Sequence, residues 1–335
     1  MVARDKVTVR ACKELVEVFN RDYPPSSVDF VPTGSVMLDY LFGGGFPRGK
    51  VVLFSSAKAL GKTLVAVSMC KSLLQSTKGV VLYLDVEQGL DKSLIEKVIP
   101  EDVRERFIVH TPATYEAAEL IIEGYSASKE GLIGVIIDSV TALLPESVLD
   151  KENNRIGAKA SAEGMFTFRL KIMAAVNRFG VLYINQQRAN IQMSGGGKGS
   201  PYKAAGGFAL PHNIDYDIMM KPDSFVKDLI GNKIGACVRL VNDKNRVVGD
   251  RSVYLYLKYG YGISNIASIV SLLKFKGFVK AAGPYFKVTL PFLDKEVNVN
   301  GNAGIEGFVQ THFDELVKTV CTPELVSEYA LNFKP

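Results

Sequence analysis

The residues best suited to chemistry lie between Ser56 and Thr63, where the chain reads Ser-Ala-Lys-Ala-Leu-Gly-Lys-Thr. A Gly-Lys-Thr ending is typical of a phosphate-binding loop, in which backbone N–H groups and the N-terminus of the following helix bind phosphate. In such a loop Lys62 reaches the outer phosphates and the Thr63 hydroxyl binds Mg²⁺. The opening glycine of the usual pattern is Ser56 here. The pattern predicts a nucleotide site, and a Gly-Lys-Thr turn in another kind of α/β protein is the alternative.

Acidic side chains follow two apolar runs farther along the chain. Asp138 ends one run, where the carboxyl edge of a sheet would bring it beside the loop to support a metal ion. Glu87 follows the run that ends at Leu84, and a carboxylate there can activate a water molecule as a general base. A plain turn residue at Asp138 and a solvated acidic loop around Glu87 are the structural alternatives. With the loop, these acids favour Mg²⁺-dependent nucleotide hydrolysis.

Gln186 follows a third apolar run and precedes a long polar segment, residues 189–205. A neutral amide at this place can form a hydrogen bond to the terminal phosphate of the nucleotide. The amide could thereby couple the state of the nucleotide to the conformation of the segment. The charged residues at its start and within it, Arg188, Lys198 and Lys203, are all basic. Long loops of this kind are usually functional or disordered, and a cationic one suits a nucleic-acid backbone. A solvated insertion is the alternative.

Two further groups of cations are candidates for binding. Residues 145–159 also follow a strand end and contain Arg155 and Lys159, although acids accompany them. Because both polar segments would leave the same sheet edge, a polymer lying there could be coupled to the phosphates. Lys244 and Arg246 lie beside a later strand. They could pair with acids in their own domain or act on the nucleotide of a neighbouring subunit.

The apolar runs before these residues are continuous rather than alternating, which indicates strands buried on both faces of a mostly parallel sheet covered by helices. The runs are residues 50–55, 79–84, 134–138, 180–185 and 214–220. Two later runs, 236–241 and 252–259, predict flanking strands, with antiparallel pairing as one possibility.

Smaller units precede and follow this core. Residues 11–19 have helical spacing, and the Pro24-Pro25 pair ends it. A helix this short must pack on its own core or on a neighbouring subunit. Small helical segments and a hairpin-like stretch at 285–299 follow the core. We therefore expect a helix with linker at 1–30, a nucleotide-binding core at 31–262 and a small α+β domain at 263–335.

Composition excludes several classes of protein. Of 335 residues, 47% are hydrophobic and 22% charged, as in soluble globular chains. No apolar stretch reaches the roughly 18 residues of a membrane span, and no secretory signal pattern is expected. The four cysteines and three histidines are dispersed, which fits a reducing interior and argues against a zinc site. The formal net charge of +5 permits a polyanionic partner.

The order of these pieces resembles that of the RecA recombinases, including phage-encoded relatives of the UvsX type. The similar segments are residues 33–39, 43–50, 85–91, 137–140, 184–188, 205–210, 244–246, 261–263 and 281–286. The resemblance thus covers nearly the whole chain, and the ordered set is more specific than any single motif.

This resemblance implies a RecA-like P-loop ATPase core that uses ATP and Mg²⁺. The nucleotide-binding residues would be Ser56, Ala57, Lys58, Ala59, Leu60, Gly61, Lys62, Thr63, Leu64, Asp91 and Asp138, with Thr63 and Asp138 at the metal. Glu87 would activate the attacking water, and Gln186 would sense the γ-phosphate. Lys244 and Arg246 would reach the ATP of the neighbouring subunit and, with Lys62, complete the catalytic set.

The resemblance also implies two DNA-binding loops, at about 145–160 and 187–205. The DNA contacts would be Arg155, Lys159, Arg188, Ile191, Lys198, Lys203, Gly206 and Gly207. The implied partners are single- and double-stranded DNA, further copies of the chain in a helical filament, and mediator or single-strand-binding proteins, with no membrane. The implied location is the cytoplasm of a bacterial or phage-infected cell.

The expected function is formation of filaments on single-stranded DNA, with DNA-stimulated ATP hydrolysis, homologous pairing and strand exchange. The alternatives are a filament-forming DNA-binding protein with little ATPase activity and a related hexameric helicase-type motor. The chain departs from the family pattern at Ser56, Lys58, Leu60, Leu94 and His212, and two of these departures carry an expectation for the nucleotide site. Ser56 is expected to cost backbone freedom where phosphate approaches, and Leu94 replaces an aromatic that often stacks on adenine, which predicts weaker base selectivity.

Overall fold

The computed structural model describes residues 29–127, 131–149, 158–189, 202–204, 213–228, 230–245, 251–321 and 325–326. At residues 149, 158, 187–189, 202–204 and 243–245 only the backbone is described. Several predictions fall outside the described residues: the helix at 11–19, the DNA contacts of Arg155, Ile191, Lys198, Gly206 and Gly207, and the role of Arg246.

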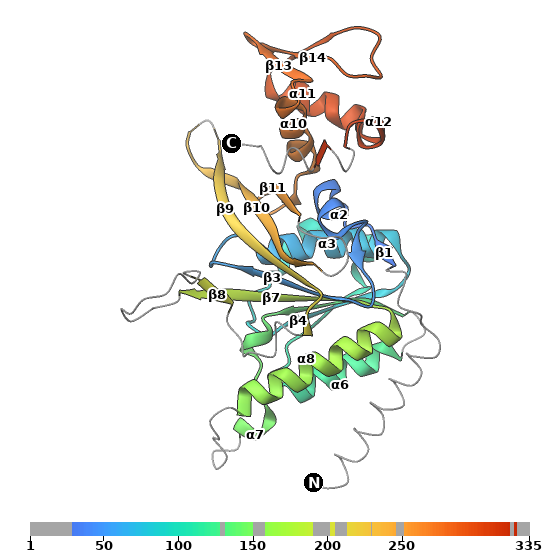
Figure 1. Cartoon of the computed structure of the whole chain (residues 1–335), viewed down its shortest axis with the longest axis vertical. Coiled ribbons are helices and arrows are strands. Elements are labelled where there is room, and N and C mark those ends of the chain that lie inside the picture. Colours follow the sequence, from blue (N-terminus) through green and yellow to red (C-terminus); the bar gives the residue numbers. More distant parts are fainter. Residues whose placement is uncertain are drawn as a thin grey trace.

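A ten-stranded mixed sheet forms the centre of the molecule (Figure 1). Its strands are β3 (Val51–Ser56), β4 (Val80–Asp85), β5 (Phe107–His110), β6 (Leu132–Asp138), β7 (Gly180–Ala189), β8 (Tyr202–Ala204), β9 (Tyr216–Lys227), β10 (Lys233–Asn245), β11 (Ser252–Lys258) and β12 (Gly262–Ile263). Their order is β12-β11-β10-β9-β3-β7-β6-β4-β5, and β8 pairs with β7. From β9 to β5 all neighbours are parallel, whereas β9 to β12 pair antiparallel. The predicted α/β fold with a mostly parallel sheet is confirmed.

The strand predictions differ from the structure at several places, among them the short strands β8 and β12, which the sequence does not predict, and β9 and β10, which are longer than the predicted runs. The five central runs and the two antiparallel flanking strands are present, but the sequence does not predict the short edge strand β5. In addition, β7 continues past residue 185 to Ala189, because its last three residues pair antiparallel with β8. The predicted polar loop at 187–205 therefore begins and ends in paired strands.

Helices cover both faces of the sheet, as Figure 1 shows. On one side lie α2 (Val36–Phe42), α3 (Lys62–Ser76), α4 (Lys92–Val98) and α5 (Glu101–Arg104), and on the other α6 (Tyr115–Ser126) and α8 (Ala158–Asn177). The successive residues Leu53 and Phe54 of β3 pack in the two opposite cores. This two-sided burial explains why the strand sequences are continuously apolar. The short η1 (Val140–Ala142) and α7 (Glu146–Leu149) follow β6.

The C-terminal part contains a separate three-stranded antiparallel sheet. Its elements are α10 (Asn265–Phe275), β13 (Val279–Ala282), β14 (Tyr285–Val288), β15 (Val297–Asn300), α11 (Gly301–Thr311) and α12 (Phe313–Thr319). Strands β14 and β15 form the predicted hairpin. Buried residues of α10 and α11, such as Ile269 and Ile305, join the same apolar cluster as Leu257 of β11. The domain boundaries at 30 and 262 remain predictions.

The short β1 (Phe30–Val31) and β2 (Phe46–Pro47) pair with each other beside α2. Side-chain caps begin several helices. Ser35, Thr114 and Ser264 each accept a hydrogen bond from the backbone N–H three residues on. In the part of the chain that the structure describes, no helix has the length and apolar character to cross a membrane.

Candidate active site

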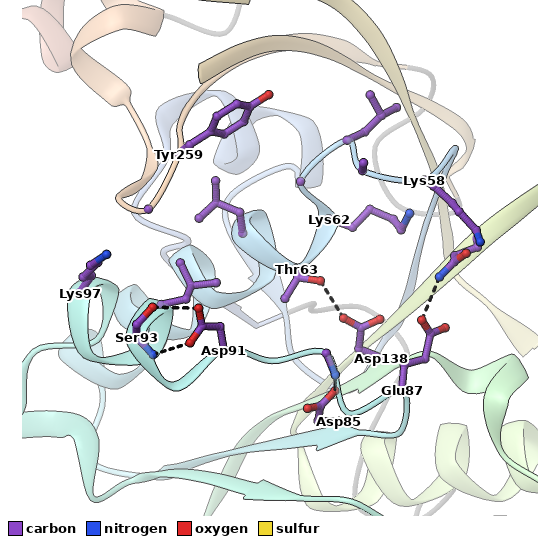
Figure 2. Close-up of a pocket in the computed structure, with 18 residues that line it drawn as sticks. Lys58, Lys62, Thr63, Asp85, Glu87, Asp91, Ser93, Lys97, Asp138 and Tyr259 are labelled. Atoms are coloured by element: carbon purple, nitrogen blue, oxygen red, sulfur yellow. Dashed lines mark hydrogen bonds between the residues drawn. The ribbon is translucent and has the colours of Figure 1, made fainter. Parts of the chain in front are cut away.

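A cavity of about 690 Å³ opens at the carboxyl ends of the central strands. At one end it is lined by residues 58–64 together with Glu87, Asp138 and Gln186 (Figure 2). At the other end the lining residues are Asp91, Ser93, Leu94, Lys97, Tyr259 and Gly260. This edge is where open α/β sheets bind their ligands. Among the predicted nucleotide-binding residues, only Ser56 and Ala57 are absent from the lining.

The loop between β3 and α3 lines the cavity with residues 58–64, which include the start of α3. Gly61 precedes α3 with a φ of 85°, and no described side chain caps the first turn of that helix. A Cβ atom at Gly61 would lie 2.9 Å from Cδ1 of Leu257. The left-handed backbone therefore favours glycine, and a side chain here would also force the Leu257 methyl group to shift. Uncapped N–H groups at a helix N-terminus are suited to bind an anion, which makes this end of α3 a candidate phosphate site.

Ser56 stabilises the loop through hydrogen bonds of its side chain. It is the last residue of β3, pairs with Gln186 and Met220, and is not among the described residues with positive φ. The backbone cost expected at this position therefore does not arise, because an extended strand residue needs no glycine. Its buried Oγ accepts a hydrogen bond from Nζ of Lys62 at 2.8 Å and donates one to the carbonyl oxygen of Ala57 at 2.6 Å.

The replacement Ser56→Ala is expected to release the Lys62 ammonium from its nearest acceptor. Because hydrogen bonds to charged groups contribute about 1.5–3 kcal/mol, we expect the ligand-free protein to lose stability on this scale. A phosphate would replace the lost acceptor, so nucleotide affinity should rise. Thermal unfolding with and without ATP measures both effects, and an unchanged ligand-free midpoint would contradict the assigned contact.

Lys62 is enclosed by acceptors and acids. Its Nζ also donates to the carbonyl oxygen of Ala57 at 3.2 Å. Burial lowers the pKa of Lys62, because the charged form loses water, and the negative charges of Asp138 and Glu87 act in the opposite direction. In Figure 2, Lys62 and Lys58 lie across the cavity from these two acids. The arrangement suits a phosphate between cations and a metal-supporting carboxylate.

Asp138 and Thr63 form the candidate metal site. The Thr63 hydroxyl donates to Oδ2 of Asp138 at 2.9 Å, and the Tyr83 hydroxyl donates to the same atom at 2.9 Å. Burial raises the pKa of Asp138, whereas both hydrogen bonds lower it. A hydroxyl and a carboxylate are hard oxygen ligands of the kind that Mg²⁺ prefers, so these residues fit the implied metal.

Both carboxylate oxygens of Glu87 accept hydrogen bonds. The Ser139 hydroxyl donates to Oε1 at 2.6 Å, and the side-chain amide of Gln186 donates to Oε2 at 2.9 Å. Nearby Asp85 has a structural role, since its carboxylate accepts the backbone N–H groups of Gly89 and Leu90 at 3.0 Å each. The loop after β4 is thereby held so that Glu87 faces the end of the cavity lined by residues 58–64, the candidate phosphate end (Figure 2).

The far end of the cavity contains residues that sequence reasoning missed. Tyr259 stands opposite Ser93 and Lys97 in Figure 2. Asp91 caps α4, and its carboxylate accepts the backbone N–H and the hydroxyl of Ser93 at 2.8 Å each. Leu94 lines the wall without an aromatic ring. The signal for Tyr259 was its place directly before Gly260, at the end of a predicted strand.

The predicted DNA-binding residues are only partly described. Lys159, at the start of α8, donates to the carbonyl oxygen of Thr141 at 2.7 Å. Arg188 and Lys203 are opposite each other in the β7–β8 pair, described by backbone alone. Lys244 lies near the end of β10, also described by backbone alone. Their contacts with DNA or with a neighbouring subunit remain predictions.

Comparisons with known proteins agree with this geometry. A family model described as the RecA N-terminal domain matches residues 11–264. Protein RecA of Thermus thermophilus is 30% identical over 275 residues, which are 79% of this chain and 77% of that protein. Protein RecA of Mycobacterium ulcerans is 31% identical over 263 residues, which are 77% and 74% of the two chains. The chain belongs to the RecA family.

Proposed function

We propose that this protein is a DNA-dependent ATPase that forms helical filaments on single-stranded DNA and catalyses homologous pairing and strand exchange. The observation that carries the proposal is the position of Glu87. Its carboxylate faces the phosphate end of the cavity and is bonded to Gln186, the residue that leads into the predicted DNA-binding segment 187–205. Through this hydrogen bond the proposed general base, Glu87, contacts the residue that leads into the proposed DNA-binding loop.

In the proposed reaction, the N–H groups of residues 61–63 and the Lys62 ammonium bind the phosphates. Thr63 and Asp138 hold Mg²⁺, which when bound neutralises charge on the phosphate oxygens. Glu87 accepts a proton from the attacking water. The base would lie between Tyr259 and Leu94 at the other end of the cavity. Because Leu94 cannot supply the aromatic stacking expected for the family at its position, base selectivity should be weaker.

DNA binding is proposed to act on Glu87 from two sides. Gln186 holds Oε2 from the start of the 187–205 segment. Ser139 holds Oε1, and its hydroxyl lies 3.3 Å from the Thr141 hydroxyl. Lys159 of the other predicted loop bonds to the carbonyl of Thr141. Movement of either loop on DNA would change the hydrogen bonds of the general base, which provides a route for DNA stimulation.

An exposed apolar surface supports assembly. Leu120 of α6 is 71% exposed, and Met165 and Phe168 of α8 are 52% and 50% exposed. The two helices are joined beside these residues by the ion pair of Arg169 with Glu119, at 3.1 Å. We assign this surface to residues 11–19 of a neighbouring copy, which carry apolar residues at helical spacing. Lys244 and Arg246 of a neighbour would complete the nucleotide site.

The double replacement of Leu120→Ser and Met165→Ser is expected to abolish assembly while the monomer stays folded. Both side chains are solvent-exposed in the single chain, so their loss removes apolar area only in the assembly. Light scattering with ATP and DNA measures the assembled mass. The control is Ile230→Ser at the tip of the β9–β10 hairpin, where the side chain is 84% exposed. Assembly that persists in the double variant would contradict the assignment.

ATP turnover with and without single-stranded DNA tests the proposed activity, and a fluorescence assay of strand exchange tests its outcome. One observation favours a filament-forming protein with little turnover as the second candidate. The ammonium group of Lys62 donates a hydrogen bond to Ser56, and this hydrogen bond must break or become shared when phosphate binds. Filaments without DNA-stimulated turnover in the unchanged protein would support this second candidate.

A further inference from the structure

Tyr83 is a fully buried residue in the middle of β4 whose hydroxyl reaches the candidate metal site. It donates a hydrogen bond of 2.9 Å to Oδ2 of Asp138. The Thr63 hydroxyl donates to the same oxygen, also at 2.9 Å. Both hydrogen bonds that the described residues make to this carboxylate therefore end on Oδ2.

The sheet register explains this contact. In the parallel pair of β4 and β6, Tyr83 is opposite Ile136 and Asp85 is opposite Asp138. Asp138 is thus the diagonal neighbour of Tyr83 on the same face, within reach of a long side chain. The phenol ring packs against Phe107, with centroids 5.8 Å apart. Strand pairing and ring packing together fix the hydroxyl in place.

We propose that Tyr83 is a positioning residue for the metal-supporting carboxylate, which it orients by occupying Oδ2 from the buried side. This inference rests on the proposed function, because it assumes that Thr63 and Asp138 hold Mg²⁺ with the nucleotide. Hydrogen bonds to a ligand from behind fix its orientation, and their loss typically lowers metal affinity 10–100-fold.

Burial of a tyrosine in this sheet does not by itself explain the hydrogen bond that Tyr83 makes to Asp138. Tyr183, on the strand next to β6, is equally buried, and its hydroxyl has no hydrogen-bond partner among the described residues. Burial in this sheet therefore does not by itself require a bonded phenol. The two tyrosines form a matched pair for testing, since each becomes phenylalanine by loss of one oxygen atom.

The test is the Mg²⁺ dependence of nucleotide binding, measured with a fluorescent ATP analogue on the full-length protein. For Tyr83→Phe we expect half-maximal binding to need about tenfold more Mg²⁺, with binding restored at saturating Mg²⁺. For Tyr183→Phe we expect the curve of the unchanged protein. Electron paramagnetic resonance of free Mn²⁺ gives a second readout, and the Mn²⁺ affinity of Tyr83→Phe should fall in the same proportion.

The outcomes are separable. A Mg²⁺ curve for Tyr83→Phe that coincides with that of the unchanged protein would overturn the inference. Equal weakening of binding at every Mg²⁺ concentration, with a lower unfolding temperature, would assign Tyr83 a structural role and also overturn it. If the unchanged protein itself shows no Mg²⁺-dependent nucleotide binding, the proposed function fails, and the inference fails with it.

Discussion

The replacement Glu87→Gln is expected to lower the turnover number for ATP by about 10²–10⁴-fold, because an amide cannot accept the proton of the attacking water. Nucleotide binding should persist. Glutamine keeps the size of the side chain, and its amide can still exchange hydrogen bonds with Ser139 and Gln186, which hold the carboxylate in the unchanged protein. Steady-state phosphate release with saturating single-stranded DNA measures the effect.

The control for this experiment is Glu105→Gln, which changes an exposed acid at the end of α5. It should leave turnover unchanged. Assemblies on DNA should also persist in Glu87→Gln and last longer, because slow hydrolysis retains the ATP-bound state. Turnover of Glu87→Gln at the rate of the unchanged protein would show that another group activates water, and the proposed role of Glu87 would be wrong.

The replacement Lys62→Ala is expected to remove most nucleotide affinity. Lys62 is the buried cation of the loop, and loss of one partner from a buried charge pair costs about 2–5 kcal/mol. This corresponds to an affinity at least about 30-fold weaker. Isothermal titration calorimetry with a non-hydrolysable ATP analogue and Mg²⁺ measures the affinity directly. The turnover and DNA-dependent assembly should be lost together with it.

Lys58→Ala is the matched control, because Lys58 belongs to the same loop and lines the same cavity but is exposed. Exposed charges contribute little to binding, so its affinity should change much less. Equal losses in the two variants would indicate a general electrostatic attraction. Unchanged affinity in Lys62→Ala would contradict a phosphate site at this end of the cavity.

Much of the candidate site could be predicted because parallel strands carry chain-distant residues to one edge. The Gly-Lys-Thr ending, Asp138 and Glu87 each follow an apolar run, and this order alone indicates that their side chains converge. The continuous apolar character of the runs predicted the two-sided sheet, which Leu53 and Phe54 show by packing in opposite cores.

The remaining features depend on register and strand order, which local patterns do not contain. Tyr83 reaches Asp138 only because β4 and β6 are neighbours with Tyr83 opposite Ile136. Lys62 contacts Ser56 because the loop folds back on the strand. Tyr259 lies in the cavity because the end of β11, far along the chain, comes beside α4 at this edge. Each needs a tertiary contact that sequence spacing does not specify.

The central claim is that nucleotide and DNA binding together drive assembly of this chain. Electron microscopy of the protein with single-stranded DNA, Mg²⁺ and a non-hydrolysable ATP analogue tests it most directly. The account predicts continuous helical filaments that require both DNA and nucleotide and are lost in Lys62→Ala. Discrete rings, or DNA without assembled protein, would contradict it.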